Sequence, residues 1–127
     1  MTEKSTQAAF KHEDSESLAE FIAASLSAKK AEKISIMDLR GITSLADYFV
    51  ICNGLSDVHV KSLADEVSEK VRIERDDKPW RREGLETRRW VVLDFVNVVV
   101  HIFKHDMRDF YGLEKMWGDA PVRSFED

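Results

Sequence analysis

Residues 46–67, ADYFVICNGLSDVHVKSLADEV, decide the fold because they carry a buried strand directly into a helix. The continuous apolar run Tyr48–Cys52 predicts a central strand that is covered on both faces. Ser56 is placed to cap the following helix, and Asp57 in the first turn suits the positive end of the helix dipole. The apolar stripe expected on that helix comprises Val60, Leu63, Ala64, Val67 and Val71.

The turn Gly54–Ser56 raises the question of a nucleotide site, because a glycine and a serine between a strand and a helix can hold a phosphate. A nucleotidyltransferase would also need two or three nearby carboxylates to bind magnesium. Asp57 stands alone in the helix's first turn, and the turn lacks the lysine and the glycine-rich length of a Walker loop. We therefore favour a structural turn and keep a small nucleotidyltransferase-like, nucleotide-binding enzyme as the alternative function.

Further elements follow from periodicity on either side of this unit. Ser17–Glu20 fits a capping box and predicts that the first helix begins there. Gly112 should interrupt the last helix, and the last two strands are close enough for an antiparallel hairpin. We expect helices over about 17–30, 57–75 and 106–117, and strands over 34–39, 48–52, 80–83, 90–95 and 98–103. This order predicts an α/β (α+β) fold with a single mixed sheet and helices mainly on one face.

The bulk properties indicate one soluble globular domain of 127 residues, with 43% apolar and 34% charged residues. No apolar run approaches the roughly 20 residues needed to span a bilayer. The N-terminal residues are polar and lack the apolar segment of a secretion signal, so we expect a cytoplasmic protein without membrane contact. We predict a disordered tail over 1–16, a folded domain over 17–121 and a frayed C-terminus over 122–127.

Cysteine and histidine residues give no sign of a catalytic or metal site. Cys52 is the only cysteine and lies in the apolar strand, where a buried core residue is expected. Two of the four histidines, His101 and His105, are four residues apart but straddle a strand end rather than one helical face. His59 near Ser56 has no obvious third partner. We expect no catalytic residues, no cofactor and no metal.

The charge distribution bears on the choice of partner. The net charge is −5, and the one zone with an excess of basic residues is Arg72–Arg89. Proteins that coat nucleic-acid phosphates carry a positive face, so a stand-alone RNA-binding module is disfavoured and we expect no direct sequence-specific binding of nucleic acid.

The strand that begins at Trp90 carries the most informative candidate surface. Alternation puts Trp90, Val92 and Asp94 on one face of the strand. The opposite face carries Val91, Leu93 and Phe95. If helices cover the second set, Trp90 is exposed on a sheet surface, where tryptophan often dominates binding energy. The alternative is that Trp90 packs under a loop as part of the core.

Several motifs together resemble one family, the iojap-like proteins, also called ribosomal silencing factors. They lie in the family's order over about residues 18–121 and comprise Ala46–Ile51 with Gly54 and Ser56, Glu83-Gly84, Trp90-Val91 with Asp94, Val100-His101 and Arg108–Pro121. Two departures are Asn53, where the family commonly has alanine or threonine, and Phe95-Val96, where tyrosine or leucine with glycine is usual. The second change leaves the tight turn before Asn97 open.

The resemblance implies a nucleotidyltransferase-like topology without the catalytic carboxylates, and a protein that is not an enzyme. It implies binding to the large ribosomal subunit through its ribosomal protein number fourteen, which blocks joining of the small subunit and represses translation, and a homodimer when free. An acidic protein suits a basic protein partner. Our candidate contact residues are Trp90 as the anchor, then Asp94, Glu83 and His101, and more weakly Arg81 and Arg82.

Overall fold

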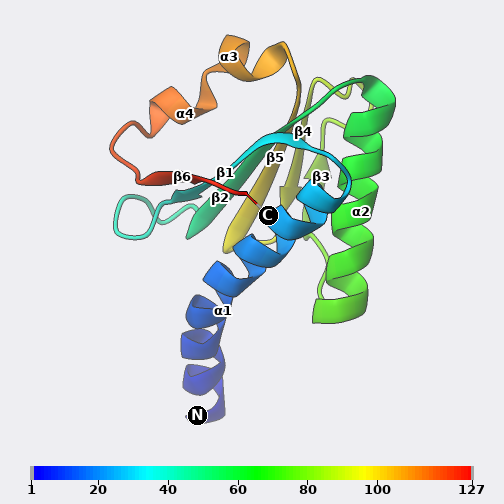
Figure 1. Cartoon of the computed structure of the whole chain (residues 1–127). Helices are drawn as coiled ribbons and strands as arrows, with labels where there is room; N and C mark the ends of the chain where they lie inside the picture. Colours follow the sequence, from blue (N-terminus) through cyan, green and yellow to red (C-terminus); the bar gives the residue numbers. More distant parts are fainter. Residues whose placement is uncertain (1, 127) are drawn as a thin grey trace.

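The computed structural model describes the backbone of residues 2–126 and the side chains of residues 15–109 and 111–126 (Figure 1). Its helices are α1 (Thr2–Ala28), α2 (Asp57–Arg75), α3 (Met107–Tyr111) and α4 (Leu113–Met116). Its strands are β1 (Glu32–Asp38), β2 (Tyr48–Gly54), β3 (Arg81–Glu83), β4 (Trp90–Asp94), β5 (Val98–Lys104) and β6 (Val122–Ser124).

All six strands form one mixed sheet in the order β3-β4-β5-β2-β1-β6. Only β2 and β5 pair in parallel, with Tyr48 opposite Val98, and the other four pairs are antiparallel. The buried strand at the centre of the sheet is β2, in which every residue is buried. The predicted single mixed sheet and the antiparallel β4–β5 hairpin are confirmed.

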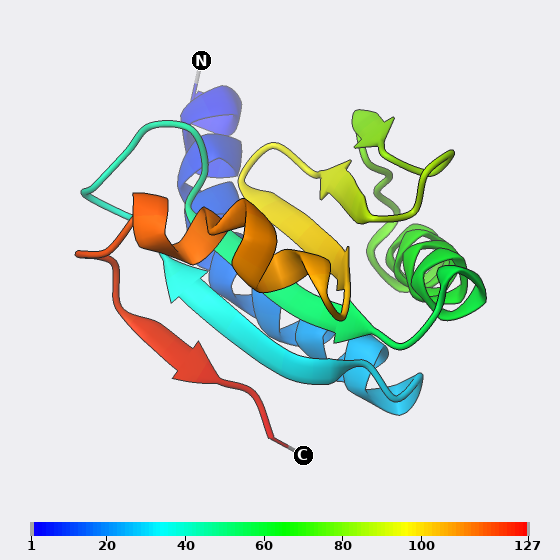
Figure 2. The ribbon, with the colours of Figure 1, turned by 90° about the horizontal axis from the view of Figure 1, so that it is seen from above.

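The two faces of the sheet are covered differently (Figures 1 and 2). We call the side on which α1 and α2 pack the α1/α2 face, and the side crossed by the shorter helices the α3/α4 face. The expectation of helices mainly on one face is confirmed, since the two long helices share the α1/α2 face. On the other face, α3 and α4 bury Leu113 against Phe49 and Phe103 and leave the sheet's β3 edge less covered.

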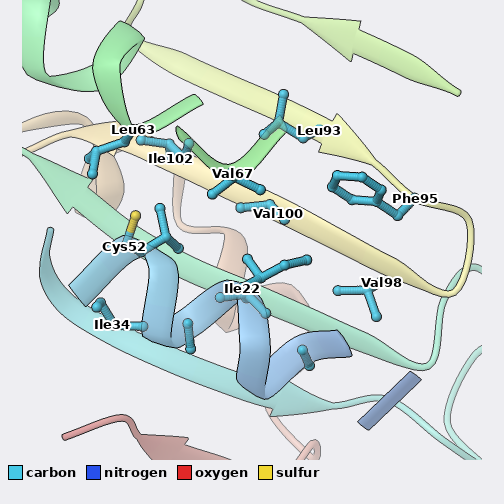
Figure 3. Close-up of a cluster of buried hydrophobic side chains, with 14 of the residues drawn as sticks. Ile22, Ile34, Cys52, Leu63, Val67, Leu93, Phe95, Val98, Val100 and Ile102 are labelled. Carbon is cyan, nitrogen blue, oxygen red and sulfur yellow. The ribbon is translucent and has the colours of Figure 1, made fainter. Parts of the chain in front are cut away.

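The main core lies between the sheet and the two long helices (Figure 3). All five residues of the predicted α2 stripe, Val60, Leu63, Ala64, Val67 and Val71, are fully buried. Cys52 is also fully buried among these apolar side chains, as the sequence predicted. Burying this apolar area from water is the main driving force for the fold.

The Gly54–Ser56 turn has a structural role. A Cβ atom at Gly54 would lie 2.7 Å from Val60 Cγ2, so glycine lets α2 pack closely against β2. The Ser56 hydroxyl caps α2 by accepting a hydrogen bond from the His59 amide over 3.1 Å. Asp57, the one carboxylate in the first turn, forms an ion pair with Lys104 over 3.2 Å. These contacts support the interpretation of this turn as architecture.

The α3–α4 segment is fixed to the sheet by Arg108. Its guanidinium group forms a two-point ion pair with Glu114 of α4, at 2.9 and 3.0 Å. The same group donates hydrogen bonds to the Ser35 hydroxyl of β1 and the Asn53 side-chain oxygen of β2. Gly112 separates the two short helices with a left-handed φ of 62°, the interruption that the sequence predicted.

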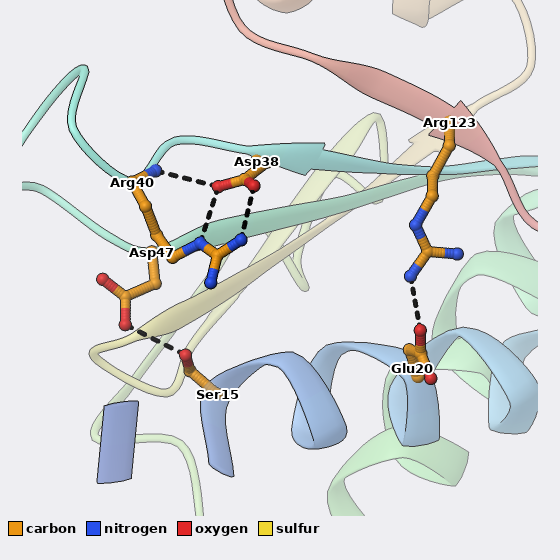
Figure 4. Close-up of polar contacts among 6 residues, drawn as sticks. All are labelled: Ser15, Glu20, Asp38, Arg40, Asp47 and Arg123. Atoms are coloured by element: carbon orange, nitrogen blue, oxygen red, sulfur yellow. Dashed lines mark hydrogen bonds and ion pairs between the residues drawn. The ribbon is translucent and has the colours of Figure 1, made fainter. Parts of the chain in front are cut away.

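The first helix begins earlier than the capping-box pattern predicted. The helix α1 starts at Thr2, so Ser17 lies inside it, and the Ser17 hydroxyl accepts a hydrogen bond from Arg75 over 2.8 Å. Ser15 is buried and donates to Asp47 over 3.0 Å, which ties this part of α1 to the start of β2 (Figure 4). The predicted cap at Ser17 was therefore wrong, because the helix continues through this position and the Ser17 hydroxyl makes a tertiary contact instead. The division of the chain at residues 16 and 121 stays a prediction.

The C-terminal segment contains a strand that the sequence did not predict. Residues Val122–Ser124 form β6, which pairs antiparallel with β1 at the edge of the sheet. Arg123 of β6 reaches across to form an ion pair with Glu20 of α1 (Figure 4). A three-residue edge strand carries too short an alternation to be recognised in the sequence, and its pairing depends on the exposed edge of β1.

Candidate partner-binding site

The β3–β4 end of the α3/α4 face carries exposed and partly exposed side chains. Burial alternates along β4: Val91 and Leu93 are fully buried on the α1/α2 face, whereas Trp90, Val92 and Asp94 are partly exposed. The predicted division of the strand into two faces is confirmed. Beside it, every residue of β3 is exposed. We call the surface formed by Arg81, Glu83, Trp90, Val92 and Asp94 the β3–β4 patch.

Trp90 lies between the two alternatives that the sequence left open, since it is half-buried. Its ring stacks on Phe103 with the ring centroids 5.1 Å apart, and Tyr111 of α3 lies 4.8 Å away. The indole Nε1 donates a hydrogen bond to Nδ1 of His101 over 3.0 Å. Trp90 is thus held in one orientation and offers a partner the exposed part of its ring rather than its N–H group.

His101 lies on the buried side of Trp90 and is only 5% exposed. Because Nδ1 accepts from the indole, a neutral His101 carries its proton on Nε2, which has no hydrogen-bond partner among the described residues. Phe49 lies against the imidazole in an edge-to-face arrangement with centroids 4.5 Å apart. Burial lowers the pKa of His101 to about 3, so the imidazole stays neutral at physiological pH. Its place in the site is to position Trp90.

A second part of the patch is a charged group at the start of β3. Arg81 forms an ion pair with Glu83 over 3.1 Å and approaches Asp94 at 3.8 Å. The Asp94 side chain is 19% exposed, and it also accepts a hydrogen bond from the Val96 amide over 2.8 Å. Glu83 and Arg81 are more than half exposed, so they are the charged side chains that a partner meets first.

Arg82 lies apart from the other predicted contact residues. It pairs in register with Leu93, so it points to the α1/α2 face, while Arg81 and Glu83 pair with Asp94 and Val92. On that side it forms an ion pair with Asp65 of α2 over 3.4 Å. Strand alternation places neighbouring residues on opposite faces, so Arg81 and Arg82 cannot both lie in one contact surface, and Arg82 was wrong as a contact residue of the patch.

Two exposed aromatic residues beside the patch were missed. Trp80 directly precedes β3 and is 65% exposed, and the Arg81 guanidinium lies 5.2 Å from its ring centroid. Tyr111 of α3 is 39% exposed and lies against Trp90. The position of Trp80 next to an edge strand was a usable signal, whereas the contact between Tyr111 and Trp90 depends on how α3 folds back over the sheet.

The structure gives other roles to the remaining reactive side chains. Burial raises the pKa of the Cys52 thiol to about 12, so the thiol stays protonated. His59, which had no obvious partner in the sequence, accepts from the Leu55 amide at Nδ1 and contacts the Lys29 carbonyl through Nε2. Within the described side chains, no three histidine, cysteine, aspartate or glutamate residues are grouped to hold a metal. Across residues 2–126, none of the helices has the length and apolar content to span a membrane.

Comparison with known proteins identifies the family of this chain. The family described as "Ribosomal silencing factor during starvation" matches residues 12–127. The ribosomal silencing factor of Bacillus subtilis is 41% identical over 110 residues, which cover 87% of this chain and 92% of that protein. The corresponding protein of Halalkalibacterium halodurans is 45% identical over 98 residues, covering 77% of this chain and 83% of that one.

A solved structure agrees with this assignment. The crystal structure of a protein from Chromobacterium violaceum superimposes with a TM-score of 0.77 at 31% identity, covering 81% of this chain and 85% of that one. The resemblance seen in the sequence motifs is confirmed by these matches. The chain belongs to the family of ribosomal silencing factors.

Proposed function

We propose that this silencing factor binds the large ribosomal subunit through the β3–β4 patch and there blocks joining of the small subunit. The partner is a basic protein at the joining face, which the family resemblance identifies as ribosomal protein number fourteen. Steric exclusion is sufficient for this mechanism, because a protein that occupies the joining face removes the surface on which the small subunit docks. No chemical step is involved, and the chain acts as a repressor of translation rather than an enzyme.

The observation that carries the proposal is the alternating burial of β4. A strand whose outward residues are a fixed tryptophan, an aliphatic residue and a carboxylate has the composition of an interface centre with a polar edge. Trp90 is pre-organised by His101 and Phe103, so little side-chain freedom is lost on binding. The carboxylates of Glu83 and Asp94 and the net charge of −5 favour a basic partner.

Adjacent residues of β3 allow a test in which charge is reversed on one face at a time. Glu83→Lys alters the patch, whereas Arg82→Glu alters the α1/α2 face one residue away. We expect Glu83→Lys to weaken co-sedimentation with purified large subunits, most strongly at low salt, and Arg82→Glu to have little effect. Equal binding by the wild type and both variants would place the interface elsewhere.

Three further parts of the proposal have their own measurements. We expect the free protein to be a cytoplasmic homodimer, so analytical ultracentrifugation without ribosomes should give twice the chain mass of 14.6 kDa.

Naked ribosomal RNA should show no tight, salt-sensitive binding to the protein, since the acidic chain relies on a protein contact. Calorimetric titration with ATP and magnesium should give no saturable heat; micromolar binding would instead support the nucleotidyltransferase-like alternative.

A further inference from the structure

We infer that the partner-binding surface continues from Trp90 onto α3, with Tyr111 as a contact residue and Arg108 as the residue that positions it. This inference rests on the proposed function and extends the β3–β4 patch to a segment outside the candidate contact residues named from the sequence. Tyr111 lies against Trp90 and its side chain is exposed. Among the described side chains of α3, it alone combines these two properties.

The two aromatic rings form one surface. Their centroids are 4.8 Å apart with an angle of 44° between the ring planes, and both rings lie close to Phe103 of β5, at 5.1 and 6.2 Å. Trp90 is partly exposed and Tyr111 is 39% exposed, so a partner that touches the indole at this side also meets the phenol ring. Tyrosine and tryptophan together are typical of the centre of protein interfaces.

This aromatic pair depends on the position of α3, which packs on the sheet through Met107 and Tyr111. The helix α3 has only five residues, too few to be stable without tertiary contacts. Arg108, on the same helix, is the residue that connects it to β1, β2 and α4. The Arg108 side chain is 11% exposed, and an arginine buried to this degree is stabilised only while its hydrogen bonds are satisfied. Loss of these bonds should release Tyr111 from Trp90.

The kind of partner that suits this pair is the basic protein already proposed. The exposed carboxylates of Asp106 and Asp109 lie on the same short segment as Tyr111, whereas its arginine is neutralised by Glu114. Asp106 also contacts His105 over 3.0 Å. Aromatic rings beside exposed carboxylates favour arginine and lysine side chains, because these cations bind both to ring faces and to carboxylates. The continuation onto α3 therefore has the same preference for a basic surface as the β3–β4 patch.

The first experiment measures the affinity for purified large subunits of the wild type, Tyr111→Ala and Tyr111→Phe. Tyr111→Ala should weaken binding about tenfold or more, as expected for a residue at an interface centre, whereas Tyr111→Phe keeps the ring and should bind within about threefold of the wild type. Ile73→Ala is the matched control, because Ile73 is an exposed apolar residue of α2. Wild-type affinity in Tyr111→Ala would overturn the inference while leaving the proposed function intact.

A double-mutant cycle separates positioning from a merely structural role of Arg108. Arg108→Lys keeps one positive charge but cannot make the two-point contact with Glu114. At temperatures well below the unfolding midpoint, Arg108→Lys should weaken binding, and the double variant with Tyr111→Ala should bind no worse than Tyr111→Ala alone. Additive losses, or a lowered midpoint with unchanged affinity, would contradict the positioning role. If the wild type itself fails to bind large subunits, the proposed function fails instead.

Discussion

The indole Nε1 of Trp90 donates to Nδ1 of His101 over 3.0 Å, and this bond joins neighbouring strands β4 and β5 beneath the candidate binding surface. It fixes the tautomer of His101 and the orientation of Trp90 together. A partner therefore meets an indole ring whose polar atom is already bonded inside the protein. The same bond makes the stability of the site depend on a neutral histidine.

Acid should destabilise the protein through His101. The pKa of His101 is lowered by burial from 6.5 to about 3 in the folded state, so between these values only the unfolded chain binds the proton. The free energy of unfolding should fall as pH falls from about 6.5 towards 3. His101→Gln keeps a hydrogen-bond acceptor but does not titrate. Between pH 6.5 and 5, we expect its free energy of unfolding, measured in urea, to fall less than that of the wild type. Parallel curves for both proteins would contradict this.

Gly84 should be required for the chain after β3 to pass close to the Trp90 backbone. A Cβ atom there would lie 1.9 Å from the Trp90 carbonyl oxygen, and the φ of Gly84 is +83°. Gly41 has a similar φ of +79° but open space around its Cβ position, so it is a matched control. We expect Gly41→Ala to cost about 1 kcal/mol from backbone strain alone and Gly84→Ala about 3 kcal/mol or more. Equal losses in thermal unfolding would show that the close contact is easily relieved.

Val96 should be a strained residue whose replacement by glycine stabilises the protein. It has a φ of 76° in the turn between β4 and β5, where the Asn97 amide donates to the Phe95 carbonyl over 3.0 Å. Positive φ costs a non-glycine residue about 1–2 kcal/mol, and the freedom that glycine adds to the unfolded chain offsets about 0.5–1 kcal/mol of the gain. Val96→Gly should raise the unfolding midpoint by a few degrees, while Val96→Ala should not. An unchanged midpoint in Val96→Gly would contradict the strain.

His59 should hold two distant turns together. Its Nδ1 accepts from the Leu55 amide over 2.9 Å, and its Nε2 lies 2.8 Å from the Lys29 carbonyl oxygen. Removing the ring leaves both backbone groups without these partners, so His59→Ala should cost about 1–3 kcal/mol in chemical denaturation. His105→Ala is the control, because the His105 side chain is half exposed and its ion pair is with its exposed neighbour Asp106. A loss no larger than in the control would show that water replaces these bonds.

Much of this fold follows from local pattern. The α2 stripe and the division of β4 into two faces depend on periodicities of 3.6 and 2 residues, which the sequence displays directly. The structure added features that arise from contacts between distant segments: the pairing of β6 with β1, the bond between Ser15 and Asp47, and the folding of Tyr111 over Trp90. The two partners of each contact are far apart in the chain, so no local pattern of residues predicts them.

The candidate site shows the same limit. The tryptophan and the carboxylates of the patch were identified from strand alternation and family motifs, but their burial was not. Trp90 was expected to be either exposed or part of the core, and it is half-buried because α3 covers only part of it. His101 was expected to be a contact residue but is buried, and its position under Trp90 follows from the register of β4 with β5.

The measurement that tests the central claim most directly is the fraction of joined ribosomes when large and small subunits are mixed with increasing amounts of the protein and separated on a sucrose gradient. We predict that the wild type lowers this fraction in a saturable way and that Ile73→Ala does the same. Trp90→Ala, confirmed as folded by circular dichroism, should leave the subunits joined. Undisturbed joining with the wild type, or full blockade by folded Trp90→Ala, would contradict the account.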